Sequence, residues 1–141
     1  MLGKLPECPC AVAIMNRIPR LLFANPTLRA RNVTALAEWY RDKLGFEIRL
    51  LWGEPVTYGM IGRDSIGLGI ALRDPNFGPA SAYIMLEGVD NLYAEFLARN
   101  VIPNRPLELT HYRMKDFDLI DPDGNRLCFG EPVDETGPAP N

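Results

Sequence analysis

Hydrophobic and polar positions follow the same pattern twice along this chain of 141 residues. Residues 27–33 alternate and lead into apolar positions at helical spacing, and residues 83–89 do the same at an offset of 56 positions (27 to 83, 33 to 89). Each half therefore predicts a strand followed by an amphipathic helix. Two similar modules that face each other predict a cleft between them, where a ligand can bind.

The first half predicts one strand, one helix and then three strands. Pro26 lies inside the first strand, which indicates an edge strand because proline cannot donate to a ladder. Asn32 suits the helix N-cap, and Gly45 suits the position just after its end. The expected elements are the strand 21–31, the helix 33–44 and the strands 46–52, 56–61 and 66–72.

The second half repeats this order after a linker at 73–79. Asp121, Pro122, Asp123 and Gly124 form a strong turn signal between the last two strands. The expected elements are the strand 82–87, the helix 89–100 and the strands 106–109, 111–120 and 125–129. We predict an N-terminal leader (1–20), one domain (21–132) made of modules 21–72 and 80–132, and a tail (133–141).

Composition excludes several classes of partner. The net charge is −3, and lysine and arginine are scattered, so we expect no nucleic-acid partner. No apolar run reaches the roughly 20 residues of a membrane helix, and the N-terminus is a poor signal peptide. These features predict a cytoplasmic protein without a membrane partner. Three cysteines make no disulfide framework, and we interpret Cys8 and Cys10 as incidental thiols.

Three motifs in order resemble the vicinal oxygen chelate superfamily, which includes glyoxalases, extradiol dioxygenases and bleomycin-resistance proteins. They are the helix and glycine at 33–46, the segment 88–96 and the turn 121–125. The resemblance spans about residues 21–132. It implies an α+β fold in which two paired βαβββ modules form a curved mixed sheet with a central cleft.

Within the superfamily, residues 24–28 resemble the crossing segment of bleomycin-resistance proteins. Those proteins are dimers that bind drug in two grooves at the subunit interface. The resemblance implies a homodimer with strand exchange and Pro26 as its hinge. The alternative is that Pro26 only protects a sheet edge.

Catalytic members of the superfamily hold a divalent metal at four inward positions. Alignment places Asn25, Gly69, Ser81 and Cys128 there. Glycine offers no ligand and serine a weak one, and the single histidine, His111, lies elsewhere. We therefore predict no metal, no other cofactor and no catalytic residue, which favours a binding protein over an enzyme.

The resemblance also assigns the ligand-binding positions. Two aromatic positions of the family fall on Tyr58 and Tyr83, a third falls on Gly69, and a tryptophan position falls on Arg113 beside Tyr112. Strand alternation places Asn25 and Arg29 on one cleft face, and Tyr83 and Met85 on the other. The candidate ligand-binding residues are Tyr58, Tyr83, Arg113, Tyr112, Arg29, Asn25 and Met85. Ordinary strand packing remains the alternative role for both Tyr58 and Tyr83.

These features predict metal-independent binding and sequestration of a planar small molecule, either a bleomycin-type drug or an aromatic metabolite. Arg29 and Arg113 favour a carboxylate-bearing ligand. Two alternatives stay open. One is a metal-dependent glyoxalase- or dioxygenase-type lyase or oxidoreductase, and the other is a non-catalytic dimerisation or regulatory module.

Overall fold

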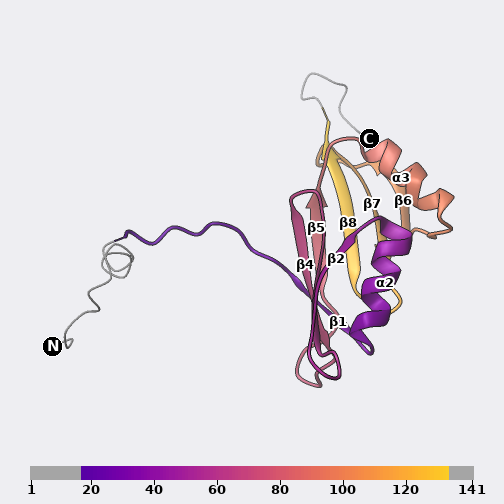
Figure 1. Cartoon of the computed structure of the whole chain (residues 1–141). Coiled ribbons are helices and arrows are strands. Elements are labelled where there is room, and N and C mark those ends of the chain that lie inside the picture. Colours follow the sequence, from indigo (N-terminus) through magenta and orange to yellow (C-terminus); the bar gives the residue numbers. More distant parts are fainter. Residues whose placement is uncertain (1–16, 134–141) are drawn as a thin grey trace.

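The computed structural model describes residues 17–133, and Cys8, Cys10, most of the expected leader and the expected tail after Val133 lie outside the described residues. Figure 1 shows both helices on the same side of the strands. The elements are β1 (Thr27–Ala30), α2 (Val33–Leu44), β2 (Glu47–Trp52), β3 (Tyr58–Arg63), β4 (Ile66–Leu72), β5 (Ser81–Met85), α3 (Val89–Ala98), β6 (Arg105–Leu109), β7 (Met114–Ile120) and β8 (Arg126–Pro132).

The two modules have the same topology. The first sheet has the strand order β1-β4-β3-β2, and the second has the order β5-β8-β7-β6. β1 pairs in parallel with β4, and β5 pairs in parallel with β8. The other strand pairs are antiparallel. Thr27 pairs with Gly69 in one module, and Tyr83 pairs with Cys128 in the other. This matched register confirms the α+β fold of two βαβββ modules.

Local sequence signals set the bounds of α2. The Asn32 side chain accepts a 2.9 Å hydrogen bond from the Ala35 backbone N–H, as expected of an N-cap. Gly45 adopts a left-handed conformation with φ of 73°, and its N–H bonds to the carbonyl of Tyr40. Both predicted ends of this helix are confirmed.

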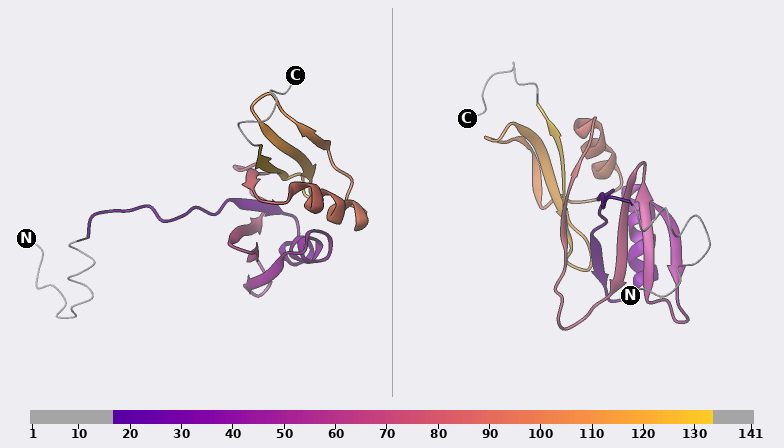
Figure 2. Two further views of the ribbon diagram at one scale, coloured as in Figure 1. Left: turned by 90° about the horizontal axis from the view of Figure 1, so that it is seen from above. Right: turned by 90° about the vertical axis from the view of Figure 1, so that its left-hand side faces the viewer.

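One hydrophobic core lies between the helices and the sheets. Strand alternation buries Leu28 and Ala30 of β1 and Ile84 of β5, which contribute to this core. In the right-hand view of Figure 2 the two sheets lie side by side and face the viewer, and α2 and α3 lie behind them. The helices therefore leave the other face of each sheet uncovered.

The turn between β7 and β8 joins the two modules. Tyr40 Oη of α2 donates a 2.7 Å hydrogen bond to Asp121 Oδ2. Asn125 accepts from the Arg29 backbone N–H at 3.0 Å and donates to the Arg29 carbonyl at 2.9 Å. Asp123 Oδ1 accepts from the Arg31 backbone N–H at 3.0 Å. The turn thus connects the second module to α2 and β1 of the first module through side-chain hydrogen bonds.

Two predicted strands are shorter than expected by three or more residues. The strand predicted at 21–31 is β1 alone, and residues 17–26 form an extended arm, which Figure 1 shows projecting away from the sheets. Pairing starts where the Pro26 carbonyl accepts from the Gly69 N–H at 2.9 Å. The strand predicted at 111–120 begins at Met114, because residues 110–113 make a turn in which Arg113 has a φ of 62°.

Candidate ligand-binding face

The two sheets share an uncovered side, here called the open face, which carries the side chains that alternate away from the helices. On β5, Ser81, Tyr83 and Met85 are exposed, whereas Ile84 is buried. This is the alternation predicted for the cleft wall. The open face is therefore the surface on which we expect to find the ligand-binding residues predicted from the sequence.

On the first sheet, Tyr58 lies across Gly69. A Cβ atom at position 69 would lie 3.0 Å from Tyr58 Oη and 3.3 Å from Thr27 Oγ1. The Tyr58 hydroxyl also lies 3.0 Å from the sulfur of Met60. The space predicted beside the small residues of β4 is therefore partly filled by the ring of Tyr58, which is half-buried.

The two arginines predicted to attract a carboxylate lie on different modules. Arg29 Nη1 donates to the Leu72 carbonyl at 3.1 Å, and its guanidinium lies 4.8 Å from the ring centroid of Phe77. Arg113 lies in the turn between β6 and β7, where its backbone N–H bonds to the carbonyl of Thr110 at 3.2 Å. Within one chain, the two residues therefore belong to different modules.

On the second sheet, two buried carboxylates occupy the open face. Asp116 is 0% exposed and Asp118 is 1% exposed. Arg105 contacts both, with Nη2 at 2.6 Å from Asp116 Oδ1 and Nε at 3.2 Å from Asp118 Oδ2. Arg126 Nη2 lies 2.6 Å from Asp118 Oδ2. We call these four side chains the carboxylate cluster.

Two of the predicted ligand-binding tyrosines complete this cluster. Tyr83 Oη donates to Asp116 Oδ2 at 2.9 Å, and Tyr112 Oη donates to the same oxygen at 2.8 Å. Tyr83 is 46% exposed and Tyr112 is 52% exposed. Gly130 of β8 makes room for Tyr83, since a Cβ atom there would clash with the phenol oxygen. The structure thus brings Tyr83 and Tyr112 together at one carboxylate oxygen.

Burial and hydrogen bonding compete at this carboxylate. Burial opposes the ionised form of Asp116, but hydrogen bonds from Arg105, Tyr112 and Tyr83 outweigh it and lower the pKa of Asp116. The pKa of Tyr83 is raised by burial first and then by the hydrogen bond to Asp116. The pKa of Tyr112 is raised by its hydrogen bond to Asp116. The carboxylate is therefore ionised at neutral pH, and both phenols keep their protons.

The remaining predicted residues border two hollows. Asn25, Pro26 and Tyr83 line a cavity of about 460 Å³ between the arm, β4 and β5. Met85 lines a cavity of about 580 Å³ between the β3–β4 turn and the start of α3. Of the seven candidates, the structure joins Tyr83 with Tyr112 and with Asn25, and places Tyr58, Arg29, Arg113 and Met85 elsewhere.

The positions where the superfamily holds its metal do not fit a metal here. The pairing of Thr27 with Gly69 and of Tyr83 with Cys128 confirms that Gly69 and Cys128 are equivalent positions. Gly69 supplies no ligand, Asn25 lies beside Gly67, and burial raises the pKa of the Cys128 thiol. Between residues 17 and 133, no group of three or more His, Cys, Asp or Glu side chains could hold a metal ion.

The sequence analysis missed Asp116, Asp118 and Arg105. The signal was present, because the two aspartates are two residues apart and alternate with Phe117 and Leu119, which are buried in the core. Alternation of this kind places both carboxylates on the face opposite the core. Pairing with Arg105 depends on the β6–β7 register, in which Arg105 lies opposite Asp118.

Comparison with known proteins addresses the fold. No family model and no curated protein matches this sequence. The bleomycin-binding protein of Streptomyces verticillus, solved with copper(II)-bleomycin, is 25% identical, and the match covers 79% of this chain and 97% of that one with a TM-score of 0.66. The bleomycin resistance determinant encoded on the transposon Tn5 is 20% identical, with 79% and 98% covered and a TM-score of 0.69.

A glyoxalase-related enzyme from Clostridium phytofermentans has a lower sequence identity but a similar fold. It is 16% identical, with 81% of this chain and 98% of that one covered and a TM-score of 0.69. The similar structures thus include drug-binding proteins and a glyoxalase-related enzyme, so they define the fold and leave the ligand open. The chain has the glyoxalase/bleomycin-resistance fold of the vicinal oxygen chelate superfamily, as its sequence motifs indicate.

Proposed function

We propose that this protein binds a planar small molecule on its open face without the help of a metal. The observation that carries the proposal is the pair of half-exposed rings, Tyr83 and Tyr112, held at one buried carboxylate oxygen. Rings fixed in this way lose little conformational entropy when a flat ligand stacks on them. Tyr58 and Trp52, which is 63% exposed, add aromatic surface on the first sheet.

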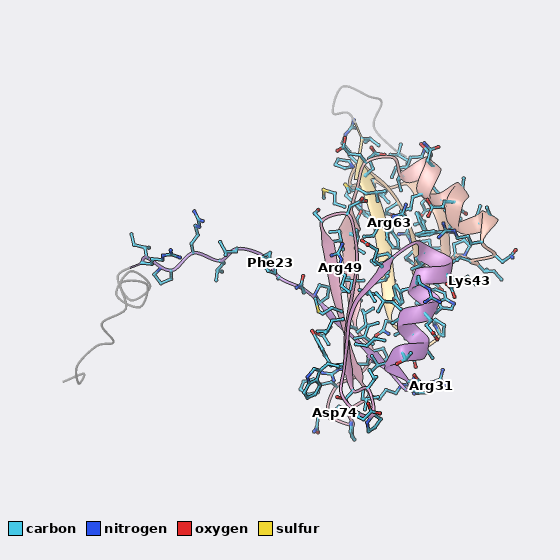
Figure 3. All side chains as sticks on the ribbon, in the orientation of Figure 1. Phe23, Arg31, Lys43, Arg49, Arg63 and Asp74 are labelled. Atoms are coloured by element: carbon cyan, nitrogen blue, oxygen red, sulfur yellow. The ribbon has the colours of Figure 1, made fainter. Side chains whose placement is uncertain are left out.

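A second copy of the chain completes the proposed site. The arm exposes Leu21 (99%) and Phe23 (81%), and Figure 3 shows Phe23 on the arm that projects from the sheets. Exposed apolar side chains of this size call for a partner surface. We propose a homodimer with exchanged arms, in which Pro26 is the hinge. The first sheet of one subunit and the second sheet of its partner then enclose the ligand.

The consequence of such binding is sequestration. A protein that holds a drug or metabolite lowers its free concentration by mass action, without any chemical step. Bleomycin-type drugs belong in the first test because similar structures include bleomycin-binding proteins. Planar aromatic metabolites are the second ligand class.

A metal-dependent reaction is the competing function. Similar structures include a glyoxalase-related enzyme and a lactoylglutathione lyase from Agrobacterium tumefaciens. The side chains at the four aligned positions, Asn25, Gly69, Ser81 and Cys128, do not make the donor set of a hard divalent cation. We therefore derive no step through a metal.

Isothermal titration with metal-free bleomycin tests the proposal. We expect saturable binding at one drug per subunit, unchanged after treatment with a chelator, and weakened at least about tenfold by Tyr83→Ala. Leu97→Ala is the matched control, because Leu97 has a similar exposure (45%) but lies on α3 at the helix side. Absence of heat with bleomycin and with a panel of neutral, cationic and anionic planar ligands would contradict the proposal. Binding that the chelator abolishes would favour the metal-dependent alternative.

A further inference from the structure

Two phenols on the open face donate their hydroxyl protons to the same carboxylate oxygen. Tyr83 Oη and Tyr112 Oη lie 2.9 and 2.8 Å from the same atom, Asp116 Oδ2. An ionised carboxylate has no proton to give, so both hydrogen bonds must use the O–H of the tyrosine. Each phenol oxygen then has only lone pairs left for a ligand.

Arg105 keeps this arrangement in place. Its Nη2 lies 2.6 Å from the other oxygen of Asp116, which favours the ionised form of the carboxyl group. A protonated Asp116 could donate its own proton to one phenol oxygen, and that phenol would then no longer donate. By keeping Asp116 ionised, the ion pair with Arg105 sets the direction of both hydrogen bonds. Asp116 therefore acts on a ligand through the tyrosines and is a positioning residue.

Two cationic groups of this surface, Arg105 and Arg126, are already paired with carboxylates. Arg105 donates to Asp116, Asp118 and Glu108, the last at 2.8 Å from Nη1. Arg126 Nη2 donates to Asp118 Oδ2 at 2.6 Å. These guanidinium groups neutralise buried carboxylates, so their charge is compensated within the protein and favours an anionic ligand only weakly.

We propose that the shared hydrogen bonds of Tyr83 and Tyr112 to Asp116 make this surface selective for planar ligands that donate hydrogen bonds, such as aromatic amides and amines, over aromatic carboxylates. The inference rests on the proposed function, since it specifies the ligand class of the same site. It reverses the preference for carboxylates that Arg29 and Arg113 suggest from the sequence. The Arg29 guanidinium is already engaged by the Leu72 carbonyl and the Phe77 ring, whereas the two phenol oxygens meet at one atom.

Three probes of the same shape separate hydrogen-bond donation from charge. Naphthalene-2-carboxamide donates, methyl naphthalene-2-carboxylate is neutral and only accepts, and naphthalene-2-carboxylate is an anion. We expect the dissociation constants, measured by fluorescence quenching and titration calorimetry on the full chain, to rise in that order. The carboxamide is expected to bind about five- to tenfold more tightly than the ester, as one or two hydrogen bonds to a phenol oxygen would give.

The double variant Tyr83→Phe/Tyr112→Phe keeps both rings and removes both oxygens. We expect its preference for the carboxamide over the ester to fall below about twofold, while the ester keeps its wild-type affinity. Tyr93→Phe, which removes a phenol from α3 on the helix side of the fold, is the control and is expected to keep the preference. A wild-type protein that binds the carboxylate as tightly as the carboxamide would overturn the inference and leave the proposed function standing. Failure of all three probes to bind would also overturn the inference, whereas the titration with bleomycin and the ligand panel decides the proposed function.

Asp116→Asn tests the positioning role. Its neutral side chain no longer obliges both phenols to donate, so the preference for the carboxamide over the carboxylate is expected to shrink at least about threefold. Tyrosinate absorbance gives a second readout, because two of the five tyrosines are expected to ionise at lower pH than in the wild type. An unchanged titration curve in a folded variant would overturn the positioning role. If Asp116→Asn does not fold, the phenylalanine variants alone decide the inference.

Discussion

Tyr40 Oη and Asp121 Oδ2 are 2.7 Å apart and form a buried hydrogen bond between the helix of one module and the turn of the other. Both side chains are almost completely buried. The same aspartate accepts hydrogen bonds from the backbone N–H groups of Asp123 and Asn125 through Oδ1. One carboxylate thus shapes the turn and ties it to α2, so the relative position of the modules depends on this pair.

Tyr40→Phe is expected to lower the free energy of unfolding by about 1–3 kcal/mol, because it leaves a buried carboxylate oxygen with one partner fewer. Urea unfolding at fixed protein concentration measures the change. Tyr58→Phe is the control, since the Tyr58 hydroxyl contacts only the weak acceptor sulfur of Met60, and we expect a loss below about 0.5 kcal/mol. Equal losses in the two variants would contradict the role of Tyr40.

The sequence could predict much of the fold because its signals are local. Asn32, Gly45 and the turn at 121–124 specify their own backbone conformations, and alternation assigns Ile84 to the core and Tyr83 to the open face. The length of β1 could not be predicted this way. Residues 21–24 form a short apolar run that suits a strand, but a strand forms only where a neighbour supplies hydrogen bonds, and pairing in this chain starts at Pro26.

The candidate site was predicted less completely than the fold. Tyr83 and Tyr112 belong to it by resemblance, and the structure joins them. Their link, Asp116, and its counterion, Arg105, depend on strand register between β6 and β7, which no short motif encodes. Position alone also suggested that Arg29 faces a ligand, whereas its guanidinium instead bonds to the Leu72 carbonyl and lies over Phe77.

Arg105→Met is expected to reverse the pH dependence of stability at the carboxylate cluster. In the wild type the folded-state pKa values of Asp116 and Asp118 are lowered, since hydrogen bonds outweigh the opposing effect of burial. Their contribution is therefore present above the unfolded pKa of about 4 and is lost as the pH falls through the folded pKa values. Without Arg105, burial is expected to raise the pKa of Asp116, whereas Asn104 and Arg126 still hold down the pKa of Asp118, so the folded state should gain stability at Asp116 as the pH falls from about 7 to about 5.

Urea midpoints at these two pH values measure the reversal. We expect Arg105→Met to be destabilised by about 3 kcal/mol at neutral pH, because a buried charge loses its partner. Arg41→Met removes an exposed ion pair with Asp42 and should leave both midpoints unchanged. A variant with the same midpoint at both pH values, as the lowered pKa values of the wild type predict for these aspartates above pH about 4, would contradict the coupling of Arg105 to Asp116.

The exposed arm gives a prediction about assembly. The double variant Leu21→Asp/Phe23→Asp places charges on the apolar side chains proposed to dock on a second copy, so the dimer dissociation constant should rise at least about tenfold. Analytical ultracentrifugation of a dilution series measures it. Ile102→Asp, at a position that is 86% exposed and follows α3, is the control and should not change the dissociation constant. A wild-type protein that stays monomeric at high concentration would contradict the proposed homodimer.

Cys128 is expected to react slowly in the folded protein, in agreement with a binding protein that uses no thiol nucleophile. The thiol is buried on the second sheet, 3.7 Å from Arg105 Nη2. Burial raises its pKa most, and the charge of Asp116 raises it further, so little thiolate is present at neutral pH. In a Cys8→Ser/Cys10→Ser background, where Cys128 is the one remaining cysteine, labelling by a disulfide reagent should be at least about 100-fold slower in buffer than in urea. Equal rates would show an accessible, ionised thiol and would reopen the case for covalent chemistry on this face.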